Sequence, residues 1–400
     1  IVGVATALVS GGPGAIFWMW VSAFFGMLTN YAENVLGILF RYRNEKNDWL
    51  GGPMIYIERG MHCKWLAVLF ACFTVLASFG IGNMTQANGI ASAINTVSGI
   101  PAWVTGITLT LLVALVIIGG IKRIAAVTEK IVPVMALVYI VGGITLLAMN
   151  YQHIPAAFGE IFAGAFNLKS VGGGVGGYVI MKAIRFGVAR GVFSNEAGLG
   201  SSVMVHSASN VKEPVKQGMW GIFEVFADTL IVCTLTALCI LTTGVLDTGA
   251  KGAQLAMAAF SHGFGGFGGT FVSIAIAFFA FSTILGWSYY GERAVEYLIG
   301  VKNLIYYKII FICLITVGCV ASLELVWDIS DTFNSLMAIP NLIGVLSLSG
   351  FVIAATKDFL SRKPSCPEEE KNITAEDLLA QHPDLSKHFF SKKEKSHTNK

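Results

Sequence analysis

Apolar residues form long uninterrupted runs along most of the 400-residue chain, and polar residues collect in the shorter stretches between them. Residues 104–121, for example, read VTGITLTLLVALVIIGGI and contain no charged side chain. A helix of about 20 residues crosses a hydrocarbon core of about 30 Å, whereas a barrel strand needs only about ten residues of alternating polarity. Because the runs are long and continuous, they predict a bundle of membrane-spanning helices.

Glycine, proline and charged residues mark the ends of the predicted spans. The spans are expected at residues 13–40, 64–98, 101–121, 131–149, 171–209, 218–244, 266–299, 303–323 and 326–357. Pro340 lies inside the last span, where a proline either ends a helix or kinks it. The chain opens at Ile1 in apolar sequence without a methionine, so residues 1–9 are expected to be the stump of one more helix in an N-terminally truncated chain.

Composition supports a multi-pass membrane protein and excludes several other classes. Hydrophobic residues make up 54% of the chain and charged residues 13%, and the mean hydropathy is +0.68. The net charge of +3 is too small to indicate a nucleic-acid partner. The seven cysteines form no CxxC pair, which argues against a zinc site and a disulfide framework. The sequence contains no hydrolase elbow, phosphate loop or HExxH motif, so we expect neither enzymatic activity nor a cofactor.

Lysine and arginine orient the predicted bundle, because they collect in cytoplasmic loops. If the first full span runs from outside to inside, thirteen basic residues lie in inside loops, and only Lys169 and Lys251 lie in outside loops. The thirteen are Arg41, Arg43, Lys46, Arg59, Lys64, Lys122, Arg123, Lys130, Lys212, Lys216, Arg293, Lys302 and Lys308.

The same rule decides between the two interpretations of Pro340. A single kinked span at 326–357 keeps the basic residues that follow it on the inside, whereas two helices would place them outside. We therefore expect a transmembrane transporter domain at residues 1–360 in the cell membrane. A polar cytoplasmic tail is expected at 361–400, with at most one short helix around 374–381.

Residues 190–202, RGVFSNEAGLGSS, place polar residues and glycines inside a predicted span. The glycines weaken a continuous helix, so we expect the helix to break between residues 191 and 200. A broken helix is tolerated in a membrane where its free backbone groups face protein or a cavity, and there it can bind ions. The alternative is that the glycines allow close helix packing. Arg190 and Glu196 are expected to form structural or gating pairs.

Residues 79–94, FGIGNMTQANGIASAI, carry two amide side chains well inside the second span. In an α-helix Asn83 and Gln86 lie three residues apart and share one face with neighbouring glycines. Amide side chains there either hydrogen-bond a zwitterionic ligand or tie two helices together, and the spacing leaves both possibilities open.

Residues 278–292, FFAFSTILGWSYYGE, place Ser282 and Thr283 about one turn before Trp287. Hydroxyl oxygens suit a weakly held monovalent cation. Serine and threonine hydroxyls in helices also bond back to the preceding turn, and tryptophan anchors helices at membrane interfaces; the pattern favours these structural roles. Further acidic residues in the spans are expected to be structural: Glu33, Glu224 and Asp228.

Several blocks of the sequence resemble the sodium:alanine symporter family, the alanine or glycine:cation symporters. The block GGPGAIFWMWVSAFFG at 11–26 is similar to the signature of that family position by position. Further similar blocks are GGPMIYI at 51–57, GNMTQAN at 82–88, RGVFSNEAGLGS at 190–201 and FSTILGW at 281–287. The resemblance covers roughly residues 1–360.

The resemblance implies an all-α membrane protein with the leucine-transporter fold, an inverted-repeat (5+5) bundle in which the first helix of each repeat is broken at the midplane. The first broken helix would be truncated here, because the Gly-Thr-Gly-Asn segment of the family would precede Ile1. The implied substrate contacts are Asn83, Gln86, Phe193, Ser194, Gly198 and Trp287, and the implied sodium ligands are Ser282 and Thr283.

The function implied by the resemblance is sodium-coupled symport of small neutral amino acids, alanine or glycine, by alternating access. The partners would be the amino acid, Na⁺ as the coupling ion and the lipid bilayer. The alternative is a non-transporting amino-acid sensor or a channel-like membrane protein.

Overall fold

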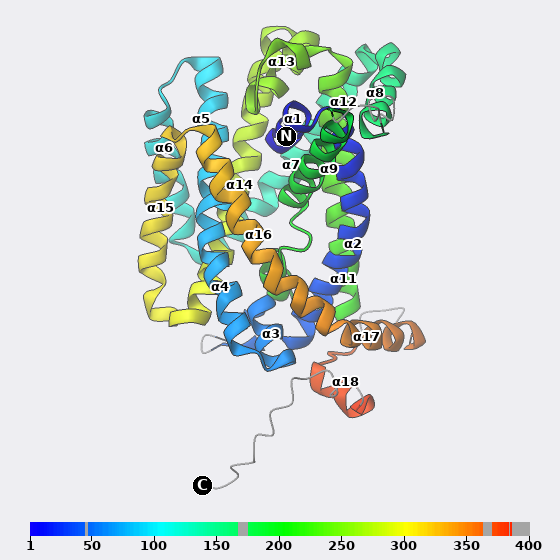
Figure 1. The fold of residues 1–400 in the computed structure, drawn as a ribbon. Coiled ribbons are helices and arrows are strands. Elements are labelled where there is room, and N and C mark those ends of the chain that lie inside the picture. Colours follow the sequence, from blue (N-terminus) through cyan, green and yellow to red (C-terminus); the bar gives the residue numbers. More distant parts are fainter. Residues whose placement is uncertain (45–46, 167–174, 363–369, 384, 386–400) are drawn as a thin grey trace.

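The protein is a bundle of helices, which the computed structural model describes for residues 1–44, 47–166, 175–362, 370–383 and 385 (Figure 1). In these residues six helices are long and apolar enough to cross a membrane, and a seventh span results if α16 and α17 are counted together. The short strands β1 (Tyr42–Arg43) and β2 (Trp49–Leu50) pair antiparallel. The prediction of an all-α membrane protein with several spans, made from the apolar runs, is confirmed.

The described residues of the first half of the chain contain three long spans. Its helices are α1 (Val2–Gly11), α2 (Gly14–Phe40), α3 (Pro53–Met61), α4 (Lys64–Phe79), the π-helical turn η1 (Gly80–Met84), α5 (Thr85–Ser98), α6 (Ala102–Ile117), α7 (Gly120–Met149), η2 (Tyr151–His153) and α8 (Ile154–Phe166). The segments α4, η1 and α5 form one continuous span. The predicted spans 13–40 and 64–98 agree with α2 and with this continuous span to within a residue.

The second half contains the broken helix and the C-terminal elements. Its helices are α9 (Val175–Asn195), α10 (Val203–Ser207), α11 (Pro214–Val225), the π-helical turn η4 (Phe226–Cys233), α12 (Thr234–Thr242), η5 (Val245–Thr248), α13 (Ala253–Phe264), α14 (Gly266–Ile299), η6 (Val301–Asn303), α15 (Leu304–Val320), α16 (Leu323–Ser347), α17 (Ser349–Arg362) and α18 (Ala375–Gln381). The predicted start of the fifth span, at 171, lies outside the described residues, as do Lys46 and Lys169.

Two features of the predicted spans are wrong, the start of the span at 131 and the kink at Pro340. Helix α7 begins at Gly120 and not at 131, because its charged first turns continue the helix. The last span bends by 54° at Leu348, whereas Pro340 stays inside α16, where it is buried. The expected end of the transmembrane domain at residue 360 falls inside α17, which packs against α2 and α11. Short helices that the hydropathy pattern did not predict are α3, α8 and α13.

The helix break is present, but it lies later than predicted, at residues 196–202 between α9 and α10. The glycines of this stretch divide between the two expected roles. Gly191 stays inside α9, where it faces Met19 and Ser22 of α2 and allows close packing. Gly198 and Gly200 have φ angles of 89° and 75°, which favour glycine and end the helix.

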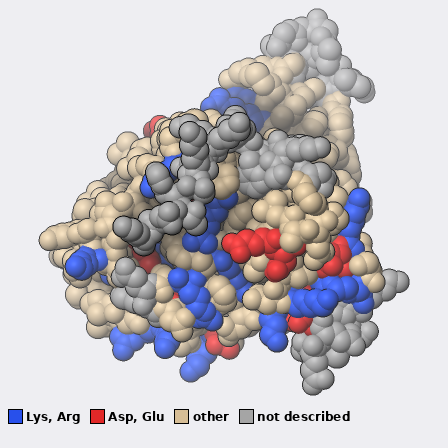
Figure 2. Space-filling view, turned by 90° about the horizontal axis from the view of Figure 1, so that it is seen from below, with Lys and Arg blue, Asp and Glu red and all other residues tan. Residues whose placement is uncertain are grey.

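Basic side chains are numerous at one end of the bundle. Helices α3, α17 and α18 lie at the lower end in Figure 1, and α8 and α13 lie at the upper end. Figure 2 shows many lysine and arginine side chains on the lower face. This is the end at which the loops predicted to be cytoplasmic gather.

The described part of the C-terminal segment packs on this lower end. The short helix expected at 374–381 is present as α18, with a capping box between Thr374 and Asp377. Leu378 is fully buried, so this part of the predicted tail is docked and not free in solution.

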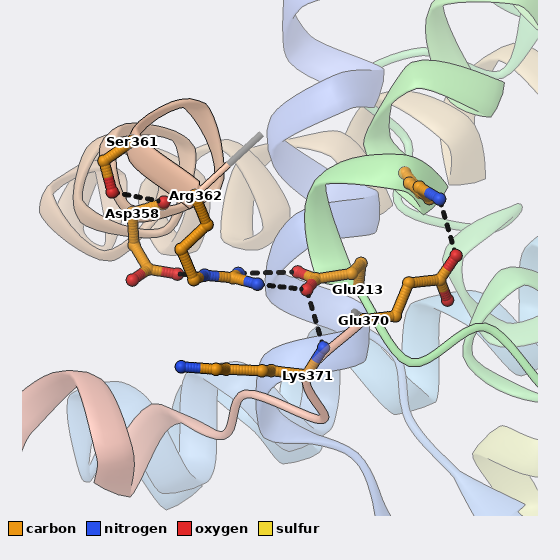
Figure 3. Close-up of polar contacts among 7 residues, drawn as sticks. Glu213, Asp358, Ser361, Arg362, Glu370 and Lys371 are labelled. Carbon is orange, nitrogen blue, oxygen red and sulfur yellow. Dashed lines mark hydrogen bonds and ion pairs between the residues drawn. The ribbon is translucent and has the colours of Figure 1, made fainter. Parts of the chain in front are cut away.

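A buried carboxylate ties the C-terminal segment to the bundle (Figure 3). Glu213, which precedes α11, accepts hydrogen bonds of 2.7 and 3.0 Å from the Arg362 guanidinium and one of 2.8 Å from the Lys371 amide. Lys216 and Glu370 form a second ion pair at 2.5 Å. These contacts hold the loop after α10, helix α17 and the C-terminal segment together.

Candidate functional site

A cavity of about 170 Å³ lies beside the helix break. Its walls come from the start of α1, from η1 and α5, from the end of α9, and from η4, α14 and α16. Pockets for drug-sized ligands occupy about 300–1,000 Å³. A cavity of this size therefore suits a smaller ligand.

Five of the predicted site residues line this cavity although they are far apart in the sequence: Gln86, Phe193, Ser194, Thr283 and Trp287. They come from three different spans. Phe193 and Ser194 lie in the last turn of α9, so they reach the cavity as helical side chains and not from the exposed backbone of the break.

Asn83 lies outside the cavity although Gln86 lines it. The Asn83 side chain is fully buried, and its Nδ2 donates a 2.6 Å hydrogen bond to the Phe311 carbonyl oxygen on α15. The π-helical turn η1 includes Asn83 and changes the direction of the side chains within it. The expectation that Asn83 and Gln86 share one face is therefore wrong.

Gly198 and Ser282 also lie outside the cavity lining. The Gly198 carbonyl oxygen accepts a 2.9 Å hydrogen bond from Asn341 on α16. The Ser282 hydroxyl donates to the Phe279 carbonyl oxygen at 2.9 Å, and the Thr283 hydroxyl does the same at 2.9 Å. Both hydroxyls thus bond back to the helix, and of the two residues only Thr283 faces the cavity.

Two carboxylates, Glu196 and Asp228, line the cavity, and the sequence pattern assigned neither of them to the site. Asp228 lies in η4, where it accepts hydrogen bonds of 2.9 Å from both Ser194 and Thr229. Among the described residues it forms no ion pair with a basic side chain. An acidic residue inside a span is costly and by default marks a pathway or site, and this was the signal that could have identified both residues.

Glu196 connects the break to the opposite wall of the cavity. It is the first residue of the break, with a φ of 56°. Its carboxylate accepts a 2.7 Å hydrogen bond from the Trp287 indole Nε1 and one of 2.5 Å from the Ser201 hydroxyl. Glu196 therefore has structural partners, as expected, but it also faces the cavity.

Two aromatic rings line one side of the cavity, and an ion pair lies next to them. The rings of Phe193 and Trp327 lie with their centroids 4.5 Å apart. The Arg190 guanidinium stacks 4.0 Å from the Trp327 ring centre and forms an ion pair with Asp331. Arg190 is 3% exposed, so the pair joins α9 and α16 with the guanidinium buried.

Solved transporter structures share this fold. The crystal structure of a mutant of the Eremococcus coleocola manganese transporter matches with a TM-score of 0.53 and 14% identity, covering 97% of this chain and 90% of that one. The same transporter in complex with an aromatic bis-isothiourea substituted compound matches with a TM-score of 0.53, 15% identity, and 96% and 80% coverage. At this identity the likeness shows a transporter fold and nothing about the substrate.

Sequence relatives define the family. The model of the sodium:alanine symporter family matches residues 1–373. The sodium/alanine symporter AgcS of Methanococcus maripaludis is 48% identical over 367 residues, which are 90% of this chain and 80% of that protein. The amino-acid carrier protein AlsT of Bacillus subtilis is 38% identical, with 91% and 77% coverage. The chain therefore belongs to the sodium:alanine symporter family, a family of sodium-coupled amino-acid transporters and not of enzymes.

Proposed function

We propose that this protein carries small neutral amino acids, alanine or glycine, across the membrane together with Na⁺, by alternating access. The observation that carries the proposal is a small cavity with two carboxylates, Glu196 and Asp228, next to a broken helix. The ammonium group of an amino acid and a sodium ion are both cations. A carboxylate on the cavity wall attracts cations in either form.

The substrate would lie between the break and α14. Gln86 offers an amide to the polar end of the amino acid, and Ser194 offers a hydroxyl. Trp287 and Phe193 would cover the small side chain, because both rings face the cavity. The limited volume then selects against large side chains.

Sodium would bind at the same cavity through oxygen atoms. Of the two predicted sodium ligands, Ser282 and Thr283, only Thr283 lines the cavity, and it would supply its hydroxyl oxygen. Asp228 would add a carboxylate from η4. Coupling requires that Na⁺ favour the conformation that binds substrate better, which is a difference in affinity between two states.

The fold proposed for this cycle is the inverted-repeat (5+5) bundle of the leucine transporter. The support is the break at 196–202, where helix α9 ends, Gly198 and Gly200 take positive φ angles, and α10 follows. This broken helix would begin the second repeat, and α1 would occupy the corresponding place in the first.

The lower end of the bundle in Figure 1 would face the cytoplasm, with the C-terminal segment on that side. The support is the concentration of lysine and arginine on the lower face in Figure 2.

In this orientation the pair Arg190–Asp331 would close the cavity from the outside. Asp331 lies in the first half of α16, and α17 follows the other end of α16 at the lower end of the bundle.

The test is uptake of labelled alanine by the full-length protein in proteoliposomes, with and without an inward sodium gradient. We expect accumulation that depends on sodium, and exchange of labelled for unlabelled alanine in counterflow. A sensor would bind alanine without exchanging it, and a channel would let alanine equilibrate without accumulation. Either result would refute the proposal.

A further inference from the structure

A buried polar cluster lies behind the helix break, on residues that do not line the cavity. Its centre is Asn341 on α16, whose side chain is fully buried. The Asn341 Nδ2 donates to the Gly198 carbonyl oxygen at 2.9 Å and to the Glu33 carboxylate on α2. The Asn341 Oδ1 accepts from the Tyr56 hydroxyl on α3. One amide thus joins three helices to the break.

The partners of Asn341 select one orientation of its amide. The Gly198 carbonyl and the Glu33 carboxylate are acceptors, so both need the NH₂ group. The Tyr56 hydroxyl supplies a donor for the remaining oxygen. A rotated amide would point its oxygen at two acceptors and leave buried groups unpaired, which is costly in a membrane.

The break needs this donor because no backbone amide of the described residues donates to the Gly198 carbonyl oxygen. Residues 196–202 are non-helical, and a freed carbonyl inside the membrane must find a partner in the protein. The contact is also tight. A Cβ placed on Gly200 would lie 2.7 Å from the Asn341 Oδ1 and would overlap the Pro53 Cγ. Helices α16 and α3 are therefore in van der Waals contact with the break.

The cluster is linked to the cavity wall through residues that are neighbours in the sequence. Gly198 is two residues after Glu196, and the Glu196 carboxylate holds the Trp287 indole at 2.7 Å. A shift of the backbone at Gly198 would therefore move Glu196 and release Trp287. The same helix α16 also lines the cavity through Trp327.

We propose that Asn341 is a positioning residue for transport: it holds the break so that Glu196 and Trp287 form the substrate and cation site, while Glu33 and Tyr56 orient its amide. This inference rests on the proposed function. It also gives a role to Glu33, a fully buried carboxylate that is hydrogen-bonded by Asn341 and by the backbone of Gly198. Its role here is to accept a hydrogen bond from Asn341.

The experiment measures alanine uptake and equilibrium alanine binding with the full-length protein carrying Asn341→Asp. This variant removes the donor to Gly198 and adds a second acidic group beside Glu33. We expect the KM for alanine, the dissociation constant and the sodium concentration for half-maximal uptake each to rise about tenfold, the effect of losing one buried hydrogen bond. A role in folding alone would lower the amount of active protein and leave these constants unchanged.

Two variants of Glu33 keep the inference testable if Asn341→Asp does not fold. Glu33→Gln retains an acceptor oxygen and should stay within about threefold of the wild type, whereas Glu33→Leu removes the acceptor and should raise the constants about tenfold. Equal behaviour of these two variants would overturn the proposed role of Glu33 as an acceptor.

Asn88→Leu is the matched control. Asn88 is also a buried amide in a span and donates to the carbonyl oxygens of Gly318 and Ala321 at 3.2 and 2.8 Å, away from the break. We expect its constants to remain those of the wild type. Unchanged constants in a folded Asn341→Asp protein, or equal changes in the control, would overturn the inference.

Failure of the inference is distinct from failure of the proposed function. A wild-type protein without sodium-dependent uptake refutes symport. The binding constants of the same variants would still test whether Asn341 positions the site.

Discussion

The indole Nε1 of Trp287 donates a 2.7 Å hydrogen bond to the carboxylate of Glu196, so the two residues connect α14 to the helix break across the cavity. The Trp287 ring packs against Gly82, where an added Cβ would overlap the tryptophan side chain. The ring therefore has a fixed position on the cavity wall.

Trp287→Ala should enlarge the cavity and change which amino acids compete for uptake. We expect weaker binding of alanine and stronger competition by larger neutral amino acids, with a shift of about tenfold in their relative affinities. Trp220→Ala is the control, because Trp220 lies on α11 with 59% of its surface exposed and does not line the cavity. The same competition profile in both variants would contradict the assignment of Trp287 to the pocket.

Asp228→Asn should reduce transport because it removes a negative charge from the cavity while keeping the shape of the side chain. We expect the alanine KM or the sodium concentration for half-maximal uptake to rise at least about tenfold, consistent with the loss of a charge-assisted contact. Glu224→Gln removes a carboxylate one turn away that is 44% exposed, and it should transport normally. Titrations of uptake against alanine and against sodium distinguish the two ligands.

Thr283→Val should raise the sodium concentration needed for half-maximal uptake, because valine has a similar shape and lacks the hydroxyl oxygen. The expected change is about three- to tenfold for the loss of one neutral ligand. Ser282→Ala serves as a control, since its hydroxyl makes the same 2.9 Å bond to the Phe279 carbonyl oxygen but lies outside the cavity lining. Identical sodium dependence of the two variants would place the ion elsewhere.

Asp331→Asn should loosen the proposed outer closure between α9 and α16. Arg190 is buried, and its Nε and Nη1 have no hydrogen-bond partner among the described residues, so the Asp331 carboxylate is its main anionic contact there. We expect bound labelled alanine to dissociate faster, by about tenfold, because a buried charge loses its counter-charge. Asp328→Asn, an exposed position on the same helix, should leave the dissociation rate unchanged.

Glu213→Ala should lower the thermal stability of the protein in detergent. The Glu213 side chain is 1% exposed and pairs with Arg362, which also contacts Asp358 at 2.7 Å. Removing one member of a buried pair costs about 3 kcal/mol or more. The exposed pair Lys64–Glu58, 3.8 Å apart with Lys64 78% exposed, offers the control Lys64→Ala. An unfolding temperature equal to that of the control would contradict the importance of this contact.

The sequence determined the spans because each needs a long apolar run, and this property is local. Helix α2 and the continuous span from α4 to α5 were predicted to within a residue. The helix break was also predictable, because glycine is the residue that readily takes the positive φ angles found at Gly198 and Gly200. Basic residues in the loops likewise predicted an end of the bundle rich in lysine and arginine (Figure 2).

The direction of individual side chains was less predictable. The spacing of Asn83 and Gln86 implied one helix face, but the π-helical turn η1 separates them. This turn packs tightly against other helices: Gly82 faces Trp287, and Gly318 of α15 faces Met84. The π-helical geometry of η1 thus occurs together with contacts to distant segments, and the three-residue spacing of Asn83 and Gln86 does not predict it.

Tertiary structure alone decided which polar residues meet. Asp228 and Ser194 are 34 residues apart, Trp287 and Glu196 are 91 apart, and Asn341 and Gly198 are 143 apart. The sequence shows that each polar residue in a span needs a partner, because an unpaired polar group is costly in a membrane. Which partner it finds depends on how the helices pack, and that arrangement is a property of the whole bundle.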